Sequence, residues 1–175
     1  MKFFSDIRLL LLSLWLGAAV FFIGVAQTAF AVLPQREQAG AVVNANLSIL
    51  NYSGMAIALV LILSSLIAIA NANRFWLWVE RFLLLLLAAA CAVDQFVIGI
   101  WLSSVRTQMG RPVDEVAIDD PLRIQFNTLH EWSVWVLFTA MIAALIAFFI
   151  ISNRKFGVAK SGNSDVYDFS KEFKI

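Results

Sequence analysis

The chain has 175 residues, of which 61% are hydrophobic and only 14% are charged. Soluble domains average about 45–50% apolar and 25% charged residues, so this composition indicates an integral membrane protein. The net charge of +1 offers no basic surface for nucleic acid. A single cysteine, Cys91, excludes a disulfide within the chain, and one histidine with four methionines supplies few ligands for a soft metal. We therefore expect neither a metal nor a cofactor.

Four long apolar runs predict four transmembrane helices, over about 9–33, 51–70, 81–105 and 129–151. The first run exceeds the apolar core of about 7–15 residues in a secretory signal peptide, so we interpret it as an uncleaved span rather than as that alternative. Residues 34–50 are more polar and begin with Pro34, which favours a helix start, and they predict a short interfacial helix. The predicted fold is an all-α membrane bundle over residues 1–152, followed by a polar tail over 153–175.

The basic residues predict the orientation of this bundle. Nine Lys and Arg residues belong to the N-terminus, the 71–81 turn and the tail, whereas four belong to the two loops on the other side. Cytoplasmic segments carry the excess of positive charge, so we expect both termini in the cytoplasm.

Small and polar residues at helical spacing predict which faces of the spans pack together, because lipid provides no hydrophobic drive between helices. In this pattern Gly17, Gly24 and Gly54 are expected to allow close helix packing. The predicted inward stripes are Ser13, Gly17, Val20, Gly24, Gln27 and Ala31 in the first span, Asn51, Gly54, Ala58, Leu61, Ser65 and Ala68 in the second, Leu87, Ala90, Asp94, Val97 and Trp101 in the third, and His130, Ser133, Leu137, Ala140, Ala144 and Ala147 in the fourth.

Asp94 lies near the centre of the third predicted span, where a charged side chain costs roughly 2.5–3.5 kcal/mol. An acid in that position indicates a functional site. We predict a polar pocket that opens on the non-cytoplasmic side, with Asp94 as its floor and Gln27, Asn51, His130 and Ser133 around it. The alternative is purely structural. In that case Gln27 and Asn51 form interhelical hydrogen bonds, His130 faces water at the interface, and Asp94 bonds a neighbour in a dry contact.

Several short motifs resemble a known family. They are Trp15-Leu-Gly17, Leu33-Pro34, Ala39-Gly40, Leu50-Asn-Tyr-Ser-Gly54 and Phe126-Asn-Thr-Leu-His130-Glu-Trp-Ser133. Together they resemble the bacterial four-span membrane family of unknown function 4149, which is similar to the transmembrane-protein-205-like proteins. The resemblance extends over about residues 8–152. It implies a four-helix bundle in the bacterial inner membrane and no settled activity.

We interpret the chain as a non-enzymatic membrane protein that binds or transports a small polar solute, ion or proton through the predicted pocket. No Ser/His/Asp set, metal cluster or phosphate-binding loop motif supports catalysis. The alternative is an accessory or structural subunit of a larger membrane complex, with a membrane-protein partner or a second copy packed against the spans. Haem held by His130 is a weaker alternative, because the chain has no second histidine.

Overall fold

The computed structural model describes residues 2–67 and 74–153, which form four long helices and contain no strand. Helix α1 spans Lys2–Val32 and α2 spans Arg36–Ile67. The third long helix consists of α3 (Arg74–Val93), a π-helical segment η2 (Asp94–Ile98) and α4 (Gly99–Met109). A short 3-10 helix, η3 (Val113–Glu115), precedes α5 (Pro121–Ser152). All four long helices are apolar and long enough to cross a membrane, so the chain is a multi-pass membrane protein of the predicted all-α class.

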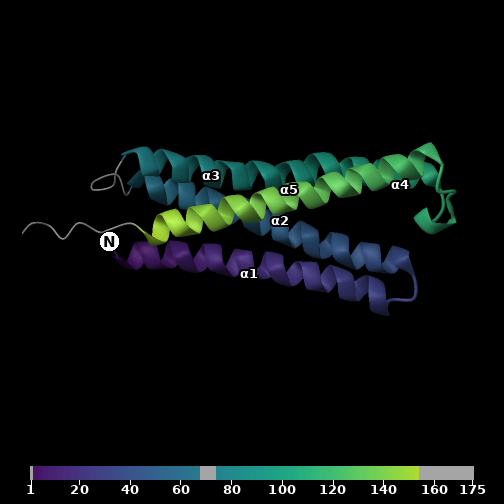
Figure 1. Cartoon of the computed structure of the whole chain (residues 1–175), viewed down its shortest axis with the longest axis horizontal. Helices are drawn as coiled ribbons and strands as arrows, with labels where there is room; N and C mark the ends of the chain where they lie inside the picture. The colour runs from purple at the N-terminus through teal and green to yellow at the C-terminus, as the bar shows by residue number, and fades with distance from the viewer. Residues whose placement is uncertain (1, 68–73, 154–175) are drawn as a thin grey trace, which may run out of the picture.

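The helices run alongside one another in an elongated bundle (Figure 1). Helix α1 begins and α5 ends at the same end of this bundle, where α3 also begins; we call it the terminal end. The α1–α2 turn and the segment between α4 and α5 lie at the opposite end, which we call the loop end. The basic-residue pattern predicts that the terminal end faces the cytoplasm.

Local sequence signals account for the helix boundaries at the loop end. Pro34 lies between α1 and α2, where its ring and its missing N–H prevent one continuous helix. Helix α4 is followed by Gly110, whose φ of 63° lies in the left-handed region that favours glycine. Asp120 caps α5 by accepting a hydrogen bond from the backbone N–H of Leu122 at 2.8 Å, and Pro121 occupies the first helical position.

Helix α2 is longer than the second predicted span, because it also includes most of the segment that was predicted as an interfacial helix. Residues 34–50 were predicted as a short interfacial helix; the structure begins the helix at Arg36, and it continues through residue 50 into residues 51–67 without a break. No proline interrupts this stretch, and buried Ala39 and Leu50 extend the packed face across it. With 32 residues, α2 is about 48 Å long, which exceeds the roughly 30 Å hydrocarbon layer. The tail after residue 153 lies outside the described residues, as does Ala68.

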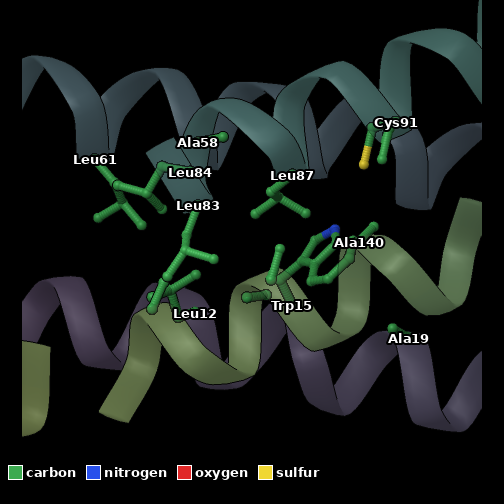
Figure 2. Packing of buried hydrophobic residues seen from close by; sticks show 14 of the residues in the cluster. Leu12, Trp15, Ala19, Ala58, Leu61, Leu83, Leu84, Leu87, Cys91 and Ala140 are labelled. Atoms are coloured by element: carbon green, nitrogen blue, oxygen red, sulfur yellow. The ribbon is translucent and has the colours of Figure 1, made fainter. Parts of the chain in front are cut away.

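The main apolar core fills the middle and the terminal half of the bundle (Figure 2). Trp15 anchors it: its indole N–H donates to the carbonyl oxygen of Leu50 at 3.0 Å, so the polar part of this buried side chain is paired. The ring lies against Gly54, where an added Cβ would be 2.8 Å from Trp15 Nε1 and 2.7 Å from Cys91 Sγ. Helices α1, α2 and α3 therefore approach one another closely at Gly54. A second apolar cluster joins α4, η3 and α5 at the loop end, formed by Ile98, Val105, Met109, Val116 and Leu129.

The inward faces of α2 and α5 match the predicted stripes except at His130, which is exposed, and at Ala68, which lies outside the described residues. Asn51, Gly54, Ala58, Leu61 and Ser65 on α2 are all buried, as are Ser133, Leu137, Ala140, Ala144 and Ala147 on α5.

The predicted inward stripe of α1 is wrong, because it lies on the outer face of the bundle. Ser13, Gly17, Val20, Gly24, Gln27 and Ala31 are all exposed, and no atom lies within 4 Å of a Cβ built on Gly17 or Gly24. The buried face instead carries Leu12, Trp15 and Ala19. The close approach of α1 and α2 uses a glycine on α2 and a large ring on α1, so α1 needs no small residues of its own there.

The segment η2 changes which residues of the third long helix face inward. The α-helical stripe predicted Val97 and Trp101 as inward residues, but both are exposed. The buried residues are Ile98 and Val105, together with Met109. A π-helical turn accommodates one extra residue, so each inward position beyond Asp94 moves one residue along the chain.

Candidate functional site

The structure brings together Asn51 of α2 and Asp94 of η2 in the interior of the bundle. The amide Nδ2 of Asn51 donates to Oδ2 of Asp94 at 2.7 Å. Only 2% of Asn51 and 4% of Asp94 are exposed. A hydrogen bond between side chains contributes about 0.5–1.5 kcal/mol, so this contact links α2 to the third long helix.

The other side-chain oxygen of Asp94, Oδ1, has no hydrogen-bond donor of this kind in the described part of the chain. Asp94 Oδ1 is buried and accepts no hydrogen bond from the described part of the chain. Buried polar atoms almost always have a partner, because an unpaired one costs about 1–3 kcal/mol. An unpartnered buried acceptor therefore marks a position where a hydrogen-bond donor from a ligand would be stabilised.

Asp94 is positioned by the π-helical turn that it begins. The backbone N–H of Gly99 donates to the carbonyl oxygen of Asp94, five residues earlier. A Cβ on Gly99 would lie only 3.2 Å from that oxygen. Glycine at this position lets the wide turn close, and such turns occur frequently at functional sites.

Asp94 and Asn51 line a cleft of about 200 Å³ between α2 and the third and fourth long helices. The described lining residues include only one ionisable side chain, that of Asp94. A sealed cavity of about 150 Å³ can hold benzene, so this cleft has room for a small organic group. Nowhere in the described ranges do three or more His, Cys, Asp or Glu side chains gather at metal-binding distance. The cleft is lined by Asn44, Leu47 and Asn51 of α2, by Asp94, Gln95, Gly99, Ile100, Leu102 and Ser103 of the third long helix, and by Ser133 of α5.

The predicted pocket residues divide into two groups. Asp94, Asn51 and Ser133 all line the cleft. Gln27 and His130 are exposed and do not line it. Gln27 belongs to the outward face of α1, whereas His130 is adjacent to the buried face of α5 that Leu129 and Ser133 define.

Three further polar residues of the cleft were not predicted. Asn44 lies seven residues before Asn51 and so shares its face of α2, a spacing that the sequence does reveal. Gln95 and Ser103 lie within and beyond the π-helical turn, where ordinary helical spacing assigns residues to the wrong face.

The comparisons with known proteins identify a family and leave the activity open. A family model described as a domain of unknown function, DUF4149, matches residues 10–111. The chain belongs to the DUF4149 family. The match includes both Asn51 and Asp94 and ends before α5, so Ser133 lies outside it. No curated protein and no solved structure gave a significant match to this DUF4149 protein.

A second buried polar contact in the DUF4149 protein lies at the terminal end and was not predicted. The guanidinium of Arg8 on α1 forms an ion pair with the carboxylate of Glu80 on α3 and donates to the carbonyl oxygen of Leu61 at 3.0 Å. Arg8 is 6% exposed and Glu80 is fully buried. Nearby, Arg81 donates to the hydroxyl and the carbonyl oxygen of Ser65 at 3.0 and 2.9 Å. These contacts hold α1, α2 and α3 together.

Apolar side chains separate this ion pair from the cleft. Asp94 lies 14 residues beyond Glu80, a distance of about 21 Å along the helix. The intervening core contains Leu12, Trp15, Ala58, Leu61, Leu84 and Leu87, which are almost completely buried (Figure 2). The cleft is therefore a blind site rather than one end of a polar path to the ion pair.

Proposed function

We propose that this DUF4149 protein binds a small cationic or hydrogen-bond-donating solute in the cleft, with Asp94 Oδ1 as the acceptor. The observation that carries the proposal is the buried Oδ1 without a partner on a residue that lines the cleft. Since Asp94 is the one ionisable residue among the described lining residues, a positively charged ligand would be favoured over an anion. The oxygens of Asn51 and Ser133 supply further acceptors nearby.

The apolar core between Asp94 and the Arg8–Glu80 pair favours binding over conduction. A cation crossing that layer would lose its polar partners, at a cost of several kcal/mol. We propose a non-enzymatic binding protein of the bacterial inner membrane with both termini in the cytoplasm. In that orientation the cleft lies toward the non-cytoplasmic side, because it extends from Asp94 toward the loop end.

The test is binding of radiolabelled methylammonium to the full-length protein in lipid nanodiscs, measured by equilibrium dialysis against empty nanodiscs. Asp94→Asn keeps the shape of the side chain and removes its charge. The variant should bind about tenfold more weakly or worse, as expected for the loss of a hydrogen bond to a charged group. Asp6→Asn, which changes an exposed acid on α1, is the matched control and should bind as the wild type does. Equal binding by Asp94→Asn, with an unchanged circular dichroism spectrum, would refute the proposal.

A specific observation also favours the accessory-subunit alternative. The outer face of α1 presents Gly17, Gly24 and Gln27 without contacts to the other described helices, and such small and polar residues pack membrane helices together. If a partner or a second copy packs there, replacing both glycines by leucine should lower the assembly mass in mild detergent while the protein still folds. A wild-type protein that runs as a lone monomer would count against this alternative.

A further inference from the structure

Beyond the loop-end side of the cleft, the side chain of Arg106 links three helices. Arg106 lies on α4, one turn beyond Ser103, and its Nη2 would be 3.6 Å from a Cβ built on Gly40 of α2. Its guanidinium carbon lies 5.6 Å from the centre of the Phe126 ring on α5. The side chain therefore connects α4 with α2 and α5, one turn beyond the cleft residue Ser103 toward the loop end.

A pair of aromatic rings joins α2 and η2 next to the Asn51–Asp94 contact. Tyr52 of α2 and Phe96 of η2 meet edge to face, with ring centres 6.1 Å apart. Both residues are immediate neighbours, one or two positions along the chain, of the Asn51–Asp94 pair. Because they neighbour Asn51 and Asp94 along the chain, the two rings lie close to the depth of Asp94.

Between these two contacts, the lining of the cleft continues onto the outer surface of the bundle. Ile100 lines the cleft and is nevertheless 60% exposed, and Asn44 and Ser103 are likewise both lining and exposed. We call the opening between Asn44 and Leu47 on α2 and Ile100 and Ser103 on α4 the lateral window. It faces sideways, away from the axis of the bundle.

The lateral window lies at a depth where its surroundings are lipid. Asp94 is 13 residues from Arg81 and 12 from Arg106, or about 18–20 Å from each basic residue along the helix. That position is close to the middle of a hydrocarbon layer roughly 30 Å thick. The window extends from there toward the loop end, so a molecule passing through it comes from the bilayer.

We propose that the ligand is a primary amine carried on an apolar chain, and that it enters sideways from the bilayer through the lateral window. This inference rests on the proposed function, in which Asp94 accepts a hydrogen bond from a cation. A primary ammonium offers three N–H donors, one of which meets Asp94 Oδ1. Leu47, Ile100 and Leu102 line the rest of the cleft and contact the apolar chain, whose far end stays in the lipid.

The experiment compares dodecylamine with methylammonium on the full-length protein in phosphatidylcholine nanodiscs, with empty nanodiscs as the blank. Dodecylamine should bind at least about tenfold more tightly at a given aqueous concentration, because its apolar chain concentrates it in the bilayer onto which the lateral window opens. Ser103→Trp fills the lateral window and should weaken dodecylamine binding about tenfold or more. Ser104→Trp, next to it on the exposed surface and outside the cleft lining, is the matched control and should have no such effect.

A photoreactive dodecylamine provides a second measurement that needs no variant. Its adducts on the wild-type protein should map to the residues of the lateral window, and Asp94→Asn should abolish them. Adducts confined to the outer face of α1, or dodecylamine binding that is no tighter than methylammonium binding and insensitive to Ser103→Trp, would overturn lateral entry. If methylammonium binding still depends on Asp94 in that case, the proposed function stands and only this inference fails. If neither amine depends on Asp94, both fail.

The lipid composition of the nanodiscs distinguishes two sources of the primary amine, a lipid headgroup and a free lipophilic amine. Phosphatidylethanolamine carries a primary ammonium, whereas the quaternary headgroup of phosphatidylcholine has no N–H to donate. Competition with dodecylamine when phosphatidylethanolamine is added to the nanodiscs would assign a lipid headgroup as the ligand. Undiminished dodecylamine binding would assign a free lipophilic amine. Either outcome upholds a primary amine bound through the window.

Discussion

Gly54→Ala offers the sharpest test of how the helices pack. The added Cβ would lie 2.7 Å from Cys91 Sγ and 2.8 Å from Trp15 Nε1, so it meets α3 and α1 at once. Real Cβ atoms essentially never show distances below 3.0 Å, so the side chains of Trp15 and Cys91, or α2 itself, would have to shift. The displacement would also stretch the 3.0 Å hydrogen bond between Trp15 and the carbonyl oxygen of Leu50.

Two opposing effects determine how much Gly54→Ala changes the free energy of unfolding. Over-packing a tight core costs about 1–3 kcal/mol, whereas glycine to alanine within a helix gains roughly 0.5–1 kcal/mol. We therefore expect Gly54→Ala to lower the free energy of unfolding by about 0.5–2 kcal/mol. Unfolding of the purified protein by increasing mole fractions of dodecyl sulfate, followed by circular dichroism, measures this change.

Gly17→Ala and Gly24→Ala are matched controls on α1. Nothing lies within 4 Å of a Cβ at either position, so both variants should be as stable as the wild type or up to about 1 kcal/mol more stable. Combining Gly54→Ala with Cys91→Ala removes one of the two clashes and should recover part of the lost stability. If Gly54→Ala is harmless while the α1 substitutions destabilise the protein, α1 packs through its glycine face and our assignment of its orientation is refuted.

Two further substitutions test separate contacts by the same unfolding assay, and one deletion tests the π-helical turn by methylammonium binding. Arg8→Met should cost about 3–5 kcal/mol, because it removes the guanidinium that forms an ion pair with the fully buried Glu80. Adding Glu80→Gln should restore part of that loss, and equal losses in the single and double variants would contradict this. Trp15→Phe keeps a ring but removes the N–H that bonds the carbonyl oxygen of Leu50, so it should cost about 1 kcal/mol, and an unchanged stability would argue against the bond. Deleting Phe96 removes the extra residue of η2 and preserves the buried face of α4, so the variant should fold but bind methylammonium about tenfold more weakly; wild-type binding would show that the π-helical turn does not position Asp94.

The candidate site was partly visible in the sequence. Asp94 is conspicuous because a carboxylate is rare in an apolar span, and Asn51 lies on a helix face that small residues identify. Spacing along one helix cannot show whether two polar residues on different helices lie at the same depth and azimuth. Asn51 does meet Asp94, whereas Gln27 and His130 are exposed. Arg8 and Glu80 lie 72 positions apart, and nothing local to either residue indicates their pairing.

Composition, span length and helical periodicity by themselves determined that this is an all-α membrane protein with four long apolar helices, and they located the inward faces of α2 and α5. Those features are local: an apolar run must form a helix in lipid to satisfy its backbone, and a face rich in small residues permits close approach. The tertiary structure alone decided the orientation of α1 and the register of α4. Trp15 fits over Gly54 on another helix, so the glycines of α1 face outward. The extra residue in η2 places Ile98 rather than Val97 in the core. The same π-helical segment begins at Asp94, which lines the cleft.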